Sequence, residues 1–192
     1  MSIVLLGSTS GSCTLQEQAV AGNTTLTLPT FNGTVGLLVS GTSVASTSGT
    51  SIDFTGIPSG VRRITISVSG LSTNGTANYL IQSGSGSVEN TGYLGASTTA
   101  AASVATANYT TGFGIGNAPG STTLLNGIAT MTLINSSTNL WAFNFVGGHS
   151  ESTRTVFSGA SKAFSGTIDR VRITTSNGTD TFDAGTINIL YE

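Results

Sequence analysis

Short runs in which apolar and polar residues alternate recur along the whole chain. In residues 63–69, Ile64, Ile66 and Val68 alternate with hydroxyl side chains. A period of two places apolar side chains on one face of a strand, whereas in a helix the same pattern would scatter them around the axis. The pattern predicts half-buried β-strands. Similar runs occupy residues 24–29, 35–40, 50–57, 77–82, 129–134, 140–146, 167–174 and 186–191.

The segments between these runs are rich in Gly, Asn, Ser and Thr, and the chain holds 27 serines and 33 threonines. Short strands separated by such turn residues are typical of all-β sandwiches and barrels. We predict an antiparallel β-sandwich, jelly-roll-like, with a short extended β segment at the N-terminus. Asn-Gly at 74–75 and at 177–178 predicts two tight hairpin turns. They are either a duplicated hairpin or, as we favour, two stretches that follow the same turn rules.

Charged residues make up only 7% of the 192 residues, and the net charge is −2. This charge argues against nucleic-acid binding, which needs a basic surface. The regular pattern of hydrophobic residues argues against a highly charged, intrinsically disordered chain. The sequence also lacks the helical periodicity of apolar residues that a helical bundle requires. No apolar run approaches a membrane span of about 18 residues.

Cys13 is the single cysteine and cannot form an intramolecular disulfide. Because no basic segment precedes the short apolar run at residues 3–6, we expect synthesis in a cytoplasm without a signal peptide.

The composition suggests a division near residue 40. Residues 1–40 are interpreted as an extended attachment segment, residues 40–51 as a Ser/Gly/Thr-rich connector, and residues 41–192 as the β-sandwich domain. Apolar residues of the first segment need burial, and short β segments achieve this by adding to an exposed sheet edge of a neighbour. The candidate attachment residues are Leu26, Leu28, Val35, Leu37 and Leu38.

Residues 84–119 have the least regular pattern. Their centre, residues 97–107, is rich in Ala, Ser and Thr and is compatible with one short helix or with a long loop between strands. Residues 109–113 are again typical of a strand.

Three aromatic residues alternate in one predicted strand: Trp141, Phe143 and Phe145. One interpretation is a platform on which a sugar ring stacks, with Trp141 and His149 as candidate glycan contacts. The other is the core face of a sandwich strand, where aromatic side chains bury most area. We favour the core.

Two clusters of polar residues contain side chains that occur in catalytic or metal sites. His149, the only histidine, lies beside Ser150 and Glu151, but adjacent residues are a poor geometry for a nucleophile and its base, so we favour a polar loop. Asn177, Asp180 and Asp183 offer oxygen ligands for calcium but lack the spacing of a calcium loop, so we favour a hydrogen-bonded turn. We therefore predict no catalytic residues, no metal and no cofactor.

A glycine-rich stretch and a pair of arginines are the two remaining features of the sequence. The glycines of residues 112–116 lack the following helix of a phosphate-binding loop. Arg170 and Arg172 are expected to form solvated or interfacial ion pairs, with Asp169 of another subunit or with Asp180 across the turn.

Several segments resemble virion proteins of tailed bacteriophages. GSTSGSCTLQEQAVAGNTTLTLP at residues 7–29, followed by GTV at 33–35, is similar to a segment that recurs in such proteins. DFTGIPSGVR at residues 53–62 and DTFDAGTINILYE at residues 180–192 resemble the β-rich C-terminal domains of phage fibre and appendage proteins, cyanophage ones among them. The resemblance covers most of the chain except residues 84–127.

The resemblance implies a non-enzymatic structural virion protein without catalytic residues. Tail fibres usually carry a long shaft, for which a chain of this length leaves no room. Within this class of proteins we therefore favour a trimeric capsid decoration (cement) protein over a tail fibre. The implied partners are two further copies of the chain and the major capsid protein or other virion proteins, with no nucleic acid and no membrane. The alternatives are a receptor-binding domain that recognises host-surface carbohydrate and, third, a glycan depolymerase.

Overall fold

The computed structural model describes residues 2–6, 12–16, 36, 38–116, 120–150 and 153–192. The chain divides into two compact units, Met1–Val35 and Gly36–Glu192. In the first unit, β1 (Ser2–Leu6) and β2 (Ser12–Gln16) pair antiparallel. The strand predicted at residues 24–29 lies outside the described residues. No helix in the described part of the chain is long and apolar enough to cross a membrane.

The larger unit contains a long antiparallel sheet of nine strands. The pairing order runs from β3 through β15 to β9, and β4 also pairs with β15. In that order the strands are β3 (Val39–Ser40), β15 (Phe182–Tyr191), β6 (Arg63–Thr73), β11 (Leu125–Asn135), β12 (Leu140–His149), β13 (Arg154–Ala163), β8 (Leu94–Ala100) and β9 (Val104–Tyr109), with β4 (Val44–Ala45) beside β15.

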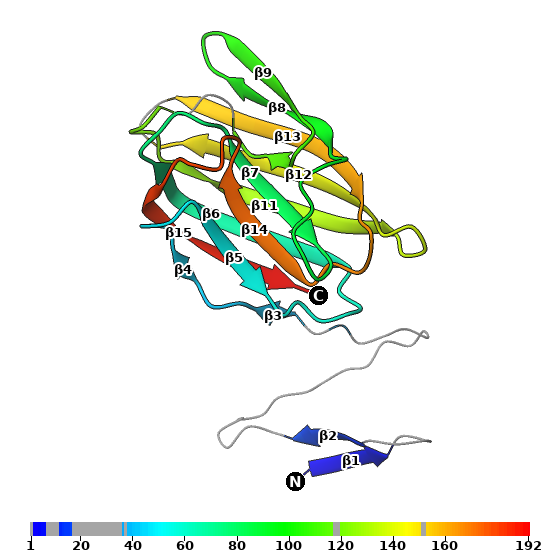
Figure 1. The fold of residues 1–192 in the computed structure, drawn as a ribbon. Helices are drawn as coiled ribbons and strands as arrows, with labels where there is room; N and C mark the ends of the chain where they lie inside the picture. The colour runs from blue at the N-terminus through cyan, green and yellow to red at the C-terminus, as the bar shows by residue number, and fades with distance from the viewer. Residues whose placement is uncertain (1, 7–11, 17–35, 37, 117–119, 151–152) are drawn as a thin grey trace. The chain divides into compact units, whose positions relative to one another are not determined.

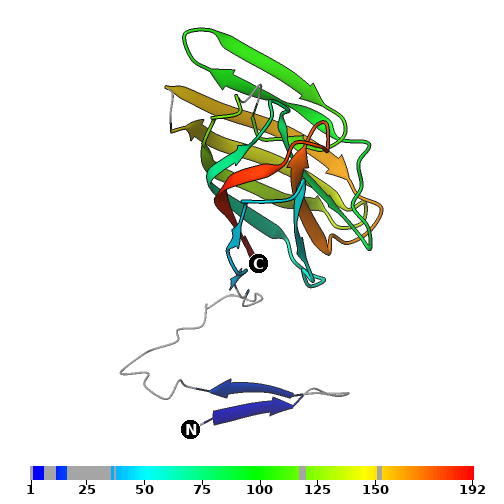
Figure 2. The same ribbon diagram turned by 60° about the vertical axis from the view of Figure 1, so that its left-hand side comes forward.

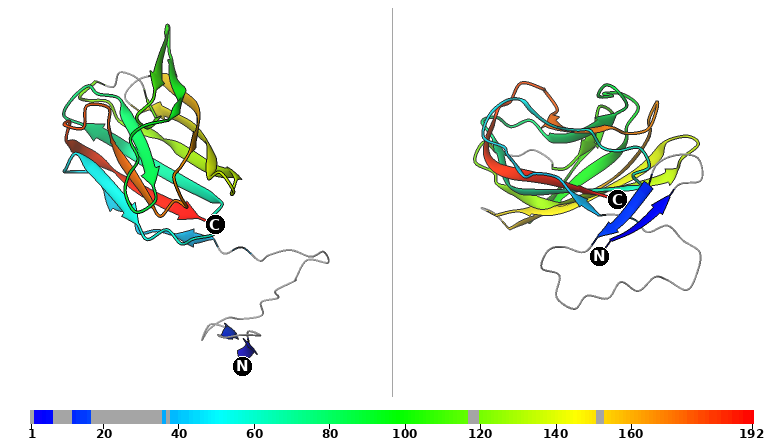
Figure 3. Two further views of the ribbon diagram at one scale, coloured as in Figure 1. Left: turned by 45° about the vertical axis from the view of Figure 1, so that its right-hand side comes forward. Right: turned by 90° about the horizontal axis from the view of Figure 1, so that it is seen from below.

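A second antiparallel sheet of four strands packs against the long one, and the two form separate layers (Figures 1 and 3). Its strands, in order, are β10 (Phe113–Gly114), β7 (Tyr79–Gly84), β14 (Arg170–Thr175) and β5 (Ser51–Thr55). The predicted all-β antiparallel sandwich is confirmed.

The core lies between the two sheets and follows the period of two. In β6, Ile64, Ile66 and Val68 are buried, while the hydroxyl residues between them are half-exposed. In β14, Val171 and Ile173 are fully buried from the opposite sheet. Burying large apolar side chains from both inner faces is the main stabilising contribution in such a sandwich.

The interpretation of residues 97–107 as a helix or a loop is wrong. Residues of β8 and β9 form an antiparallel hairpin, with Ser97 opposite Ala107, and β13 pairs with β8. This hairpin is the terminal pair of the long sheet (Figure 2). Its Ala, Ser and Thr side chains produce little hydropathy contrast, so the alternation that reveals the other strands is weak here.

The two Asn-Gly sequences do not form hairpin turns. Asn74-Gly75 joins β6 of the long sheet to β7 of the short one, and Asn177-Gly178 joins β14 of the short sheet to β15 of the long one. Gly178 has a positive φ of 68°, as a turn glycine does, whereas neither Asn74 nor Gly75 is in the left-handed region. Both sequences mark crossings between layers.

The interpretation of residues 40–51 as a connector is also wrong. Within this segment, β3 and β4 pair with β15 at the edge of the long sheet. Ser46 is fully buried, and its hydroxyl donates a hydrogen bond of 2.8 Å to the Ala184 carbonyl. The low-complexity stretch is therefore part of the domain.

Candidate functional site

The outward-facing side of five neighbouring strands in the long sheet carries no charged side chain. We call the outward positions of β11, β12, β13, β8 and β9 the uncharged face. They hold only Gly, Ala, Ser, Thr, Asn and a few large apolar residues. The charged residues of β13, Arg154 and Lys162, share the register parity of buried Val156 and so belong to the other side.

Three large apolar residues lie side by side across the uncharged face. Ile128 of β11 is opposite Val146 of β12, which is opposite Phe157 of β13. Their exposed fractions are 54%, 53% and 49%. The row continues into Thr98 of β8. Single exposed apolar residues are ordinary, whereas these three are contiguous and lie on a surface without charge.

The aromatic residues of β12 lie in the core, as we favoured. Trp141, Phe143 and Phe145 are each at least 97% buried. The Phe143 ring stacks on the ring of Phe113 from the other sheet, with centroids 4.5 Å apart and planes 6° from parallel. Because Trp141 and His149 are both buried, neither presents a surface on which a sugar ring could stack in this chain.

His149 is not part of a polar loop. It is the last residue of β12, opposite Leu125 and Arg154, and is 93% buried. Ser150 follows the strand, and both its backbone N–H and its hydroxyl donate to the Leu124 carbonyl. Glu151 lies outside the described residues.

The other polar cluster forms a hydrogen-bonded turn. The Asp180 carboxylate accepts a hydrogen bond from the Asn177 side-chain amide at 2.6 Å and one from the Ala77 N–H at 2.9 Å. These bonds hold the pKa of Asp180 below its ordinary value, the Asn177 bond contributing most. Within the described residues, no group of three or more His, Cys, Asp or Glu is placed to hold a metal ion.

The two arginines of β14 form ion pairs within the chain. Arg170 pairs with Asp169, which precedes it, and not with Asp180. Arg172 donates two hydrogen bonds of 2.7 Å to the carboxylate oxygens of Asp53, the residue opposite it on β5. Sequence reasoning did not find Asp53 because cross-strand neighbours are set by register.

A polar groove lies on the outer side of the four-stranded sheet. It has a volume of about 350 Å³. The sequence pattern did not reveal it, since its walls come from β5, β7, β14 and four loops. The lining residues are Thr50, Ser51, Leu80, Gln82, Asn90, Thr111, Arg172, Thr174, Thr175, Ser176, Asn177 and Gly178.

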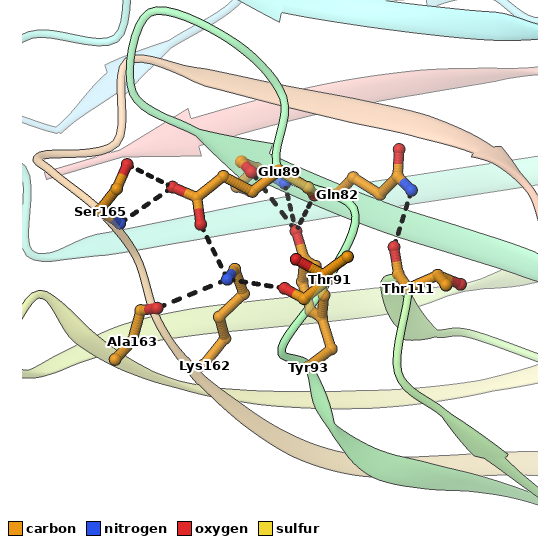
Figure 4. Close-up of polar contacts among 9 residues, drawn as sticks. Gln82, Glu89, Thr91, Tyr93, Thr111, Lys162, Ala163 and Ser165 are labelled. Carbon is orange, nitrogen blue, oxygen red and sulfur yellow. Dashed lines mark hydrogen bonds and ion pairs between the residues drawn. The ribbon is translucent and has the colours of Figure 1, made fainter.

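A buried ion pair fixes the loop between β7 and β8 beside this groove (Figure 4). The Lys162 ammonium lies 2.8 Å from a Glu89 carboxylate oxygen and 5.0 Å from the ring centroids of Tyr93 and Phe164. The other Glu89 oxygen accepts bonds from the backbone N–H and hydroxyl of Ser165. Burial alone would raise the pKa of Glu89, but the hydrogen bonds from Lys162 and Ser165 outweigh it and hold the pKa below its ordinary value.

The Tyr93 hydroxyl belongs to the same network. It donates to the Glu89 carbonyl at 2.9 Å and accepts a bond from the Ser83 N–H at 3.0 Å. Burial raises the pKa of this hydroxyl, which therefore stays protonated as a donor.

The candidate attachment residues fall mostly outside the described part of the chain. This is true of Leu26, Leu28, Val35 and Leu37. Leu38 is described and is 65% exposed, directly before β3.

Comparisons with protein-family models, with curated proteins and with solved structures each found no match to this chain.

Proposed function

We propose that this chain is a non-enzymatic structural protein of a tailed-phage virion, a homotrimeric capsid decoration (cement) protein. The observation that carries the proposal is the uncharged face with its row of Ile128, Val146 and Phe157. The assignment to a phage virion is supported by the resemblance of three segments to virion proteins, residues 7–29, 53–62 and 180–192.

The symmetry of a homo-oligomer explains why the absence of charged side chains from the uncharged face favours contact between copies of the chain. When identical subunits assemble, the same residues recur at every interface, and burying an unpaired charge there would be unfavourable. A face of hydroxyl, amide and apolar side chains avoids that penalty, and its exposed apolar row gains from burial.

The oligomer is tested with the purified full-length chain. Native mass spectrometry should give three times the 19.2 kDa chain mass. The double variant Val146→Asp, Phe157→Asp should give the mass of the monomer instead. Both substitutions place a carboxylate on the uncharged face, where it would be buried between subunits. Thr55→Asp on β5 of the other sheet is the control and should stay trimeric. A monomer at all concentrations would overturn the trimer.

The location is tested by cryo-electron microscopy of particles produced with and without the chain. Density that fits the sandwich on the capsid surface is the expected result. Density at the tail would instead support the alternative function, a tail-fibre or appendage domain that recognises host-surface carbohydrate. Absence of the chain from purified particles would overturn both.

A further inference from the structure

We propose that the polar groove on the four-stranded sheet binds a neutral saccharide of one or two sugar rings. The site is independent of the virion role, since a capsid decoration protein and a tail appendage would both present it. It also differs from the glycan contacts expected from the sequence, because Trp141 and His149 are not among its lining residues.

The floor of the groove consists of cross-strand pairs. Gln82 of β7 is opposite Arg172 of β14, and Leu80 is opposite Thr174. Val171 and Ile173, which alternate with Arg172 and Thr174, are buried between the sheets. The floor side chains therefore project outward from paired backbone, which fixes their spacing.

The charge of the groove favours a neutral ligand. Arg172 is the only charged residue among those that line it, and it donates two hydrogen bonds to the Asp53 carboxylate, which balances its charge. The hydrogen bonds from Arg172 to Asp53 raise the pKa of Arg172, so the guanidinium keeps its positive charge. An anionic ligand at Arg172 would be repelled by the adjacent Asp53 carboxylate.

Several polar groups remain available to a ligand. Arg172 bonds Asp53 through Nε and Nη2, so its Nη1 donors have no partner among the described residues. Gln82 donates Nε2–H to the Thr111 carbonyl at 2.7 Å, and this orients its Oε1 as an acceptor (Figure 4). Asn90 adds a side-chain amide that both donates and accepts. A sugar hydroxyl also donates and accepts, so this mixture suits a polyhydroxylated ligand.

The buried ion pair holds Asn90 in place. Lys162 Nζ bonds the side chain of Glu89 before Asn90 and the carbonyl of Thr91 after it. The Glu89 N–H also donates to the Ser83 carbonyl of β7. Backbone fixed on both sides of a contact residue lowers the entropy lost on binding.

The volume limits the ligand. About 350 Å³ lies at the small end of the range of roughly 300–1,000 Å³ for ligand pockets. Such pockets are usually lined by apolar side chains, whereas this lining is dominated by hydroxyl, amide and guanidinium groups. The groove therefore matches a short polar ligand.

The test is saturation-transfer NMR on the full-length chain with a set of neutral sugars: glucose, galactose, mannose, N-acetylglucosamine, lactose and maltose. Sialic acid and inorganic sulfate serve as anionic comparisons. We expect at least one neutral sugar to bind, and titration of that sugar gives its Kd. Absence of binding by every neutral sugar at roughly 10 mM, or binding of the anions alone, would overturn the proposal.

Variants place the binding in the groove. Asn90→Ala and Gln82→Leu should each raise the Kd by about tenfold or more while the melting temperature changes little. Asn144→Ala on the uncharged face is the matched control and should leave the Kd unchanged. A Kd that is the same in all three variants would overturn the groove as the site, whatever the oligomeric state.

Discussion

Lys162 and Glu89 form an ion pair at 2.8 Å in which the lysine side chain is 95% buried and the glutamate side chain 80%. The ammonium also donates to the carbonyls of Thr91 and Ala163, at 2.8 and 3.4 Å. The pair joins β13 of the long sheet to the loop that borders the polar groove. Its stability effect depends on which partner is removed.

Glu89→Gln should destabilise the fold more than Lys162→Met. The first change leaves a buried ammonium without its anion, for which the penalty is about 3–5 kcal/mol. The second removes the more deeply buried ammonium and keeps apolar contact with Tyr93 and Phe164, while the more exposed Glu89 carboxylate keeps its two hydrogen bonds from Ser165. Urea unfolding followed by circular dichroism measures both variants. Equal losses would mean that the ion pair does not control the stability of this loop.

The fold should lose stability as the pH falls below about 4. The folded-state pKa values of Glu89 and Asp180 lie below their ordinary values of 4.5 and 3.8. The ionised carboxylates therefore contribute stability above the unfolded-state values, and this is lost as the pH falls through the folded-state values. Unfolding free energies between about pH 7 and pH 3 should show the decline, and Asp180→Asn should make it shallower. An equal decline in that variant would contradict a contribution from Asp180.

Phe143→Ala should lower the free energy of unfolding by about 3–5 kcal/mol, through lost burial and the cavity left beside Phe113. Asn144→Ala, one residue further on the exposed side of the same strand, should change it by no more than about 0.5 kcal/mol. Denaturant unfolding of both variants provides the comparison. An unchanged midpoint for Phe143→Ala would contradict its place in the core.

Gly75→Ala should be destabilising although Gly75 does not have a positive φ. A Cβ atom there would collide with an Asp180 carboxylate oxygen, so the hydrogen bonds that Asp180 accepts from Ala77 and Asn177 would have to shift. We expect a loss of about 1–3 kcal/mol. Gly159→Ala is the control, since a Cβ there meets nothing within 4 Å and should be neutral or slightly stabilising. Thermal melts of the two variants decide this.

Leu26→Ser with Leu28→Ser should abolish the proposed attachment to particles without changing the proposed trimer. If these leucines add to a sheet edge of the capsid, removing their apolar contact weakens that addition while the sandwich is unaffected. Add-back to particles lacking the chain, followed by sedimentation, measures occupancy. Full occupancy by the variant would place the attachment surface in the sandwich domain instead.

The alternation of apolar and polar residues was sufficient to predict the fold class and most strands of the core. In β6, β12, β14 and β15 each large apolar residue pointing inward has a polar or small neighbour pointing out, and this local pattern survives in any sandwich. The same pattern predicted that Phe143 is buried. It did not reveal β8, β9 or β13, where small residues make both faces alike.

Which strands are neighbours is decided by long-range pairing, and every polar feature of the site depends on it. Asp53 meets Arg172 because β5 and β14 pair in one particular register, and Glu89 meets Lys162 because a loop folds back over β13. The Asn-Gly sequences predict turns from their local conformational freedom, but only the packing of two sheets makes those turns cross between layers. The sequence alone thus determined which residues face inward, because that depends on neighbours along the chain. The tertiary structure decided which outward residues stand together, because that depends on segments distant in sequence.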